Sequence, residues 1–294
     1  MGAEDRAVRR ILLVVAYDGT AYNGFARQSN PSCVTIEGTI DAALSDLTGE
    51  QIRVIGASRT DAGVHALCNY CVFDTASKIP AEKFAAALNV RLPEDIRIRQ
   101  SRQVEDTFHP RNMSTIKTYE YHIYNARIED PLRERYCAFT YFRLDTEKMR
   151  QAAAYLVGEH DFKSFANVKT TVLTTVREIL SIEIEETIIP VPHVMYSVKK
   201  HQPGLQDEAR EIVIRVSGRG FLYNMVRIIA GTLMDVGRGL RTPEQVKEML
   251  DAKERTLAGP TAPAKGLILT DYLILGPKPV PDNEKKLDTK AQNP

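Results

Sequence analysis

The chain has 294 residues, of which 43% are hydrophobic and 26% charged, and its formal net charge is +1. This composition is typical of a globular protein with room for two domains, and four cysteines are too few for a disulfide scaffold. No run approaches the roughly 20 apolar residues of a membrane-spanning helix, and the short apolar run near the N-terminus ends in Asp-Gly, unlike a signal peptide. We therefore expect a cytoplasmic protein with no membrane partner. The nearly neutral charge neither requires nor excludes nucleic acid.

The first part of the chain has a hydrophobic pattern that predicts the order β-α-β-β-α-β. Strands are indicated by β-branched and alternating apolar residues, and helices by apolar residues that recur every three or four positions. The predicted strands are residues 9–19, 51–59, 66–75 and 95–104, and the predicted helices are residues 35–49 and 79–93.

The second part repeats this theme with longer insertions. Its predicted strands are residues 117–125, 175–186, 210–218 and 266–275, and its predicted helices are residues 145–160, 221–237 and 242–252. A loop with Pro and Gly spans residues 198–210, and the polar, Pro-rich tail from Pro277 is predicted to be disordered.

These patterns predict an α+β fold with two similar sheet-plus-helix halves, ferredoxin-like or RRM-like and related by a pseudo-twofold axis. We divide the chain into an N-terminal tail (1–8), an N-terminal half (9–106), a C-terminal half (107–276) and a disordered tail (277–294). Binding sites often lie in clefts between domains, so we expect the active site between the two halves.

The stretch "ASRTDAGVHALCNYC", residues 57–71, holds several candidate reactive groups. Cys68 and Cys71 have the C-x-x-C spacing of a redox pair or half of a zinc site. They lie in a predicted strand, however, where residues three apart point to opposite faces. Cys33 and Cys137 are isolated and lack the spacing of further ligands. We therefore interpret the cysteines as packing residues.

Asp61 and His65 are the remaining candidates in this stretch. No Ser or Cys nucleophile motif accompanies His65, so a buried or turn-stabilising histidine is the simpler interpretation. Asp61 precedes Gly63 between two predicted strands, and the residues of this segment by themselves favour a carboxylate that stabilises a turn. Arg59, two positions earlier, leaves a second interpretation open: a cleft loop that binds an anionic polymer and acts on it.

The motif "RTDAGVHA" at residues 59–66 resembles the signature loop of the TruA family of tRNA pseudouridine synthases. Further segments resemble that family in the same order, over about residues 9–276. They are "YDGTAYNGFARQ" (17–28), "TIEGTIDAAL" (35–44), "FHPRNMSTIKTYEYHIYN" (108–125), "HDFKSFAN" (160–167), "TVREI" (175–179), "GRGFLYNMVRIIAGTL" (218–233) and "APAKGLIL" (262–269). Ser58, where many relatives have Gly, and the variable loop at residues 199–211 depart from the family pattern.

The resemblance implies an isomerase that converts uridine to pseudouridine at positions 38, 39 or 40 of the tRNA anticodon arm. It implies a homodimer, with tRNA as partner and neither a metal nor an organic cofactor. It also assigns roles to five residues of this chain. Asp61 would be the essential carboxylate, Arg59 would fill the space of the flipped nucleotide, Tyr119 would stack on the uracil, Arg227 would pair with Asp61, and Leu267 would form an apolar wall.

Basic residues near the proposed cleft are candidate RNA contacts, although charges on exposed strands are often only solvated. They are Arg91, Arg97, Arg99, Arg102, Arg111 and Lys117. Three alternatives remain: a non-catalytic RNA-binding module, a thiol-redox or zinc protein that uses Cys68 and Cys71, and a different base-modifying enzyme.

Overall fold

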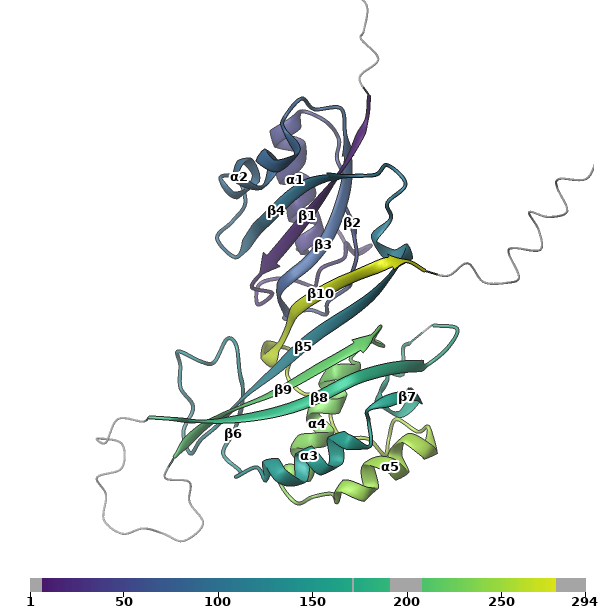
Figure 1. The fold of residues 1–294 in the computed structure, drawn as a ribbon. Coiled ribbons are helices and arrows are strands. Elements are labelled where there is room, and N and C mark those ends of the chain that lie inside the picture. The colour runs from purple at the N-terminus through teal and green to yellow at the C-terminus, as the bar shows by residue number, and fades with distance from the viewer. Residues whose placement is uncertain (1–6, 171, 191–207, 279–294) are drawn as a thin grey trace, which may run out of the picture.

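The computed structural model describes residues 7–170, 172–190 and 208–278, which fold into two consecutive groups of strands and helices (Figure 1). The N-terminal group consists of β1 (Arg9–Tyr17), α1 (Ile36–Thr48), β2 (Ile55–Gly56), β3 (His65–Thr75), α2 (Phe84–Asn89) and β4 (Ile96–Val104). The C-terminal group consists of β5 (Met113–Asn125), β6 (Ala138–Thr140), α3 (Thr146–Ala154), β7 (Gly158–Asp161), β8 (Val176–Ile189), β9 (Ala209–Arg219), α4 (Met225–Gly237), α5 (Pro243–Ala252) and β10 (Leu267–Pro277).

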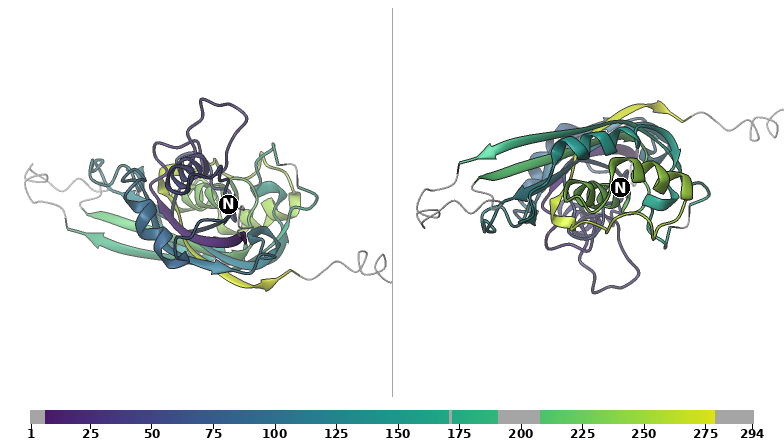
Figure 2. Two further views of the ribbon diagram at one scale, coloured as in Figure 1. Left: turned by 90° about the horizontal axis from the view of Figure 1, so that it is seen from above. Right: turned by 90° about the horizontal axis from the view of Figure 1, so that it is seen from below.

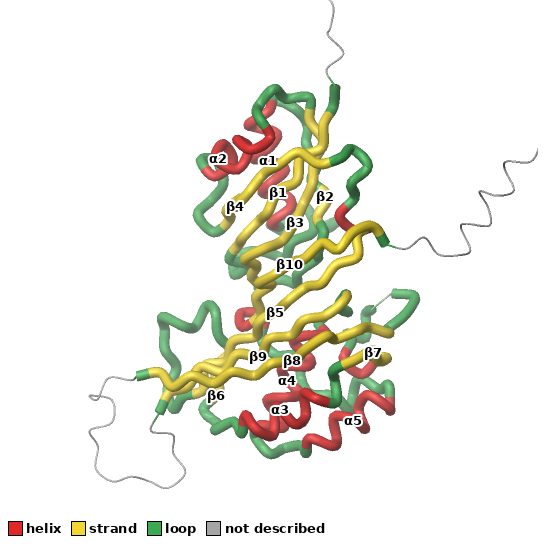
Figure 3. The backbone as a smooth tube through the Cα atoms, viewed as in Figure 1, coloured by secondary structure: helices red, strands yellow, loops and turns green. Residues whose placement is uncertain are grey.

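The ten strands of the described residues form one mixed sheet that runs through both groups (Figure 3). Its main order is β4-β1-β3-β10-β5-β9-β8-β7, while β2 pairs with β3 and β6 pairs with β5. Neighbouring strands in each half are antiparallel, as β1 is to β3 and β5 is to β9, except that the short β6 runs parallel to β5. The halves are joined by the short parallel pairing of β3 with β10.

Each half has the ferredoxin-like strand arrangement, because β4-β1-β3-β2 and β10-β5-β9-β8 place corresponding strands in the same order. This confirms the prediction of an α+β fold with two similar halves. Strand directions also repeat, since the two halves meet through a parallel pair. The division at residues 106 and 107 stays a prediction.

The helices gather on one face of the sheet (Figure 2). One cluster of buried side chains continues from Phe73 in the N-terminal half to Ile229 in the C-terminal half. Local signals set the helix ends: Thr35 accepts a hydrogen bond from the Gly38 amide at the start of α1, and Gly49 ends it with φ 71°. Among the described residues, no helix is long and apolar enough to cross a membrane.

The predicted strand at residues 51–59 is reduced to the two residues of β2. The backbone amides just before β2 donate hydrogen bonds to side chains of α1 instead of to a neighbouring strand. The Ile52 amide donates to Ser45 Oγ (3.1 Å), and the Val54 amide donates to Asp41 Oδ1 (2.7 Å). The alternating apolar pattern correctly predicted which of these residues are buried. It did not predict that their amides would bond to a helix and not to a strand.

Three predicted helices also have different bounds. The helix at 79–93 is a 3₁₀ turn followed by the short α2, and α3 ends at Ala154, so that residues 158–161 pair with β8 as β7. The helix predicted from residue 221 begins only at Met225, because Asn224 has a left-handed backbone that is incompatible with continuing a helix. Most of the predicted loop at 198–210 and nearly all of the tail lie outside the described residues.

Candidate active site

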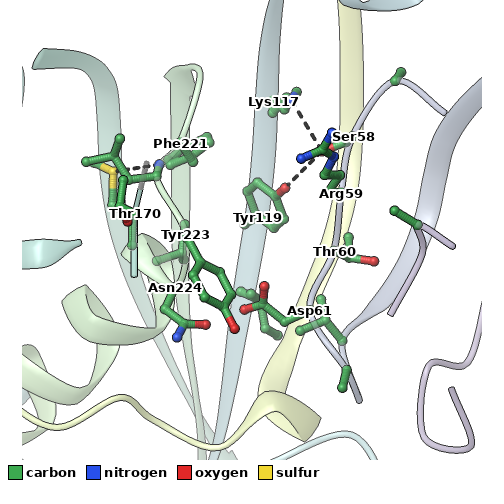
Figure 4. Close-up of a pocket in the computed structure, with 18 of the residues that line it drawn as sticks. Ser58, Arg59, Thr60, Asp61, Lys117, Tyr119, Thr170, Phe221, Tyr223 and Asn224 are labelled. Carbon is green, nitrogen blue, oxygen red and sulfur yellow. Dashed lines mark hydrogen bonds between the residues drawn. The ribbon is translucent and has the colours of Figure 1, made fainter. Parts of the chain in front are cut away.

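A cleft of about 960 Å³ lies where the two halves meet (Figure 4). One wall is the loop at residues 57–62, between β2 and β3, and the floor includes side chains of β5. The opposite wall is the segment at residues 221–226, which leads into α4, together with residues 169–170. Leu267, the first residue of β10, also lines the cleft, as do residues of the segment 23–28 that precedes α1. The cleft predicted between the halves is therefore present, and it is built from both of them.

Asp61, which lines this cleft, forms an ion pair with Arg227 of α4, which lies behind the lining residues. Arg227 Nη1 donates to Asp61 Oδ2 at 3.2 Å, and the two side chains are only 17% and 19% exposed, respectively. Burial raises the pKa of Asp61, while the charge and hydrogen bond of Arg227 act in the opposite direction. The sequence placed these residues 166 positions apart, and the fold brings them into contact.

Arg227 is held by three acceptors. Its Nε donates to the Ala262 carbonyl at 2.8 Å, and Nη1 also donates to Asn224 Oδ1 at 3.1 Å. A guanidinium remains protonated at every physiological pH, so this geometry gives Asp61 a permanent positive neighbour.

Tyr119 lies on β5 with its side chain in the cleft, although it is 7% exposed. Its ring packs edge-on against Phe221, with 5.1 Å between centroids and 86° between the planes. Its hydroxyl lies 3.5 Å from Ser58 Oγ. Burial raises the pKa of Tyr119 to about 12, so the phenol stays neutral.

Lys117, two residues before Tyr119, extends the polar edge of the same strand. Its Nζ donates to Ser58 Oγ at 3.2 Å and lies 5.1 Å from the centroid of the Tyr272 ring. Burial, and secondarily the charge of Lys278, lowers the pKa of Lys117 to about 8. The cleft thus contains an ammonium group that loses its proton just above neutral pH.

A buried polar network holds the loop that carries Asp61. Asn69 Nδ2 donates to the Ser58 carbonyl (3.0 Å) and to the Tyr17 hydroxyl (3.3 Å). The Tyr17 hydroxyl is also 2.7 Å from Thr60 Oγ1. These residues were missed in the sequence analysis. The available signal was Asn69 itself, because a polar side chain at an inward strand position is unusual without a partner.

The remaining predicted site residues are divided between the cleft and the outer surface. Arg59 is exposed at the rim of the cleft, and Leu267 is buried in its wall. Arg111 lines the cleft and donates from Nε to the Gly56 carbonyl at 2.9 Å.

The other basic candidates do not line this cleft. Arg91 pairs with Asp46, and Arg97 donates to the Pro93 carbonyl. Arg99 and Arg102 are also absent from the lining residues.

The four cysteines are free thiols, and their environment disfavours redox chemistry. Cys71 is fully buried and Cys68 is half-buried, and burial raises the pKa of both thiols, which opposes formation of the reactive thiolate. In the described part of the chain, no group of three or more His, Cys, Asp or Glu side chains is placed to hold a metal ion. His65 accepts a hydrogen bond from the Gly19 amide through Nδ1 (3.1 Å), so it supports a loop.

The geometry suits a reaction in which a carboxylate acts on a substrate that contains a flat polar ring. Asp61 supplies a carboxylate that can attack an electron-poor carbon or stabilise a cation, and the neighbouring guanidinium favours its charged form against the effect of burial. Tyr119 offers an aromatic surface for stacking, and Leu267 closes the pocket with an apolar wall.

Comparison with known proteins identifies relatives of this chain. A family model described as tRNA pseudouridine synthase matches residues 13–111 and 152–272. A tRNA pseudouridine synthase A of Brevibacillus brevis is 44% identical over 266 residues, which cover 90% of this chain and 100% of the relative. One from an Exiguobacterium species is 42% identical over 262 residues, covering 89% and 96% of the two chains. A tRNA pseudouridine synthase A 2 of Clostridium perfringens is 42% identical over 262 residues, covering 89% and 98%.

Proposed function

Since the chain belongs to the tRNA pseudouridine synthase family, we propose that it isomerises uridine to pseudouridine at positions 38, 39 or 40 of the tRNA anticodon stem-loop, with Asp61 as the nucleophile. As a member of this family it is an isomerase that converts uridine to pseudouridine in tRNA. The observation that carries the assignment of Asp61 is its place in the cleft lining together with its ion pair with Arg227.

The reaction breaks the bond between N1 of uracil and C1′ of ribose and forms a bond between C5 and C1′. The base turns in the site, C5 loses a proton and N1 gains one, so that atoms and electrons balance without a co-reactant. Asp61 can attack C1′ or C6, stabilise a glycosyl cation, or accept the C2′ proton on a glycal route, which returns that proton when C5 bonds to C1′; each route needs an ionised carboxylate. The Arg227 contact supports that ionised state against the effect of burial.

The target uridine has to leave its stack before it reaches Asp61, at a cost of a few kcal/mol. Stacking on an aromatic side chain recovers roughly 1–3 kcal/mol per base, and Tyr119, which lines the cleft, would take that role. Arg59, exposed at the rim, would enter the space that the uridine leaves, and Leu267 would limit the pocket beside the base.

The proposed partner is the anticodon arm of tRNA, bound by a homodimer in the cytoplasm. Arg111 and Lys117 line the cleft and are the basic residues best placed for phosphate contacts among those predicted. Arg91, Arg97 and Arg99 lie outside its lining, so a role for them would require RNA to extend over the outer surface. Sedimentation of the protein alone and with tRNA would test the dimer.

The decisive test combines the wild-type protein, unmodified tRNA transcripts and single-nucleotide mapping of pseudouridine. We expect modification at positions 38–40 and, for Asp61→Ala, retained tRNA binding with no product. Asp235→Ala is a matched control, because Asp235 is also a poorly exposed carboxylate (14%) paired with an arginine, Arg241, at 3.4 Å. This control should keep its activity.

Two outcomes would contradict the proposal. Full activity of Asp61→Ala would remove Asp61 from the mechanism. A wild-type protein that binds tRNA but forms no pseudouridine would favour a non-catalytic RNA-binding module.

A further inference from the structure

Asn224, the residue before α4, has an unusual backbone for its position. Its φ and ψ are 62° and 7°, in the left-handed region that residues other than glycine rarely adopt. A residue at this position normally has an extended backbone, and an asparagine there normally accepts a hydrogen bond from the first turn of the helix. Among the described residues, the Asn224 side chain makes no such bond to the helix backbone. Within the described part of the chain, the first turn of α4 therefore lacks the usual hydrogen bond from a backbone amide to the side chain of its N-cap residue.

The Asn224 side chain is instead directed to Arg227. Its Oδ1 accepts from Arg227 Nη1 at 3.1 Å, and the same nitrogen donates to Asp61 Oδ2 at 3.2 Å. The Ala262 carbonyl accepts from Nε at 2.8 Å on the other edge of the guanidinium. Asn224 and Asp61 lie at the same end of the pocket, away from Lys117 (Figure 4).

We propose that Asn224 is a positioning residue, whose left-handed backbone directs its amide oxygen to Arg227 and thereby fixes Nη1 of that residue on Asp61. The proposal rests on the function of Asp61 given above. Unusual backbone conformations persist where the surrounding structure enforces them, and they often occur at functional sites. Here the unusual backbone and the diverted side chain serve the same contact.

The chemistry of asparagine suits both requirements. Asparagine enters the left-handed region more readily than most residues, because its short polar side chain bonds locally. Its neutral oxygen accepts from the guanidinium without competing as a charge, whereas an aspartate here would place a second carboxylate beside Arg227 and Asp61. Glycine would keep the backbone and remove the acceptor, and alanine would lose both advantages.

The expected consequence is a change in the ionisation of Asp61. The charged or titratable groups that interact with it are Arg227, from α4, and Tyr119, from β5, while Lys117 and Arg59 line the same cleft. If Arg227 Nη1 loses its second acceptor, the guanidinium is less well fixed and stabilises the carboxylate less. The pKa of Asp61 then rises further, and the acid limb of activity moves to higher pH.

The test measures single-turnover rates on a tRNA transcript from pH 5 to pH 9. For Asn224→Gly we expect an acid limb about half a pH unit higher, a rate about threefold lower on that limb, and unchanged tRNA affinity. Thermal unfolding should be unaffected, because glycine adopts the same backbone. Asn224→Asp, close in shape, should move the acid limb in the same direction.

Lys253 provides a control, because it is the other described non-glycine residue with positive φ (54°), at the C-terminal end of α5. Lys253→Gly should leave the rate and its pH profile unchanged. A wild-type rate and acid limb in Asn224→Gly would overturn the inference, even with Asp61→Asn inactive and the proposed function intact. If wild-type protein makes no pseudouridine, the proposed function fails and the inference fails with it.

Discussion

Replacement of Asn69 by alanine tests whether the buried network positions the loop that carries Asp61. Asn69 is 0% exposed, lies on β3 and bonds the Ser58 carbonyl and the Tyr17 hydroxyl through Nδ2. Its Oδ1 accepts from the Tyr70 amide at 2.9 Å. The substitution removes all three bonds and leaves the strand itself in place.

The expected loss of stability follows from the groups left without partners. The Tyr17 hydroxyl retains Thr60 Oγ1, so the main losses are at the Ser58 carbonyl and the Tyr70 amide. An unsatisfied buried polar group costs about 1–3 kcal/mol, and the Tyr70 amide bond is only partly buried, so we expect the free energy of unfolding to fall by about 2–4 kcal/mol. The variant should still fold at 25 °C, because domains commonly have 5–15 kcal/mol of stability, as an order of magnitude.

The expected loss of activity is larger than for an ordinary core substitution. Ser58 lies three residues before Asp61, and a misplacement of about 1 Å at a reacting group can reduce a rate roughly 100-fold. We therefore expect kcat to fall about 10- to 100-fold while tRNA affinity changes little.

Urea unfolding and single-turnover kinetics, both at 25 °C, measure these effects. Asn89→Ala is the matched control. The Asn89 side chain also bonds to backbone groups, since it accepts from the Ile98 amide (2.8 Å) and donates to the Ile98 carbonyl (2.9 Å). Ile98 lies on β4, and neither residue lines the cleft. This control should lose about 1–3 kcal/mol and keep its kcat. A destabilised Asn69→Ala with wild-type kcat would refute the positioning role, and an unchanged stability would refute the hydrogen-bond reasoning.

Two further predictions concern Lys117 and the cysteines. Because burial lowers the pKa of Lys117 to about 8, its ammonium loses its proton as pH rises, and tRNA affinity should fall about five- to tenfold between pH 7 and pH 9. Filter binding would measure the affinity for tRNA at each pH, and the Lys117→Met variant should lack the fall between pH 7 and pH 9. Identical pH profiles for the wild type and this variant would contradict a phosphate contact by Lys117. The double variant Cys68→Ser/Cys71→Ser should retain wild-type kcat but lose about 1–3 kcal/mol of stability, because the fully buried Cys71 would become a hydroxyl. Metal analysis and kinetics check it, and bound zinc in the wild type or lost catalysis would restore the thiol-centred alternative.

Local patterns were sufficient to predict most elements of the fold. The apolar spacing of residues 35–49 and the capping residues Thr35 and Gly49 agree with α1, because a helix depends on contacts three and four residues apart. Strand alternation likewise located β3, β5 and β9, since one face of each strand is buried.

Local patterns failed where a backbone group found a distant or unusual partner. The amides of Ile52 and Val54 bond side chains of α1, so the predicted strand there is almost absent. The apolar run from Phe221 continues through Asn224 without a break in periodicity, and only the positive φ of Asn224 separates the loop from α4. Sequence spacing carries no record of such a dihedral angle.

For the site, the residues by themselves left Asp61 as a carboxylate suited to a turn, and the family resemblance of the whole chain raised it to a catalytic candidate. The same sequence was enough to group Arg59, Tyr119 and Leu267 with it by resemblance. The resemblance also paired Arg227 with Asp61, and the structure shows that contact at 3.2 Å. Tertiary structure alone decided that Arg91 and Arg97 lie outside the cleft and that Asn69 supports the loop.

The physical reason for this division is that the sequence sets the chemical type of each side chain, whereas its charge state and its contacts depend on the groups packed around it. The identity of Asp61 is written in the sequence, but its raised pKa and the opposing effect of Arg227 arise from burial and from a contact across 166 residues. The sequence by itself determined the strand and helix order and the reactive groups available. Only the fold decided which of these groups meet, because burial and hydrogen bonding are properties of the packed chain.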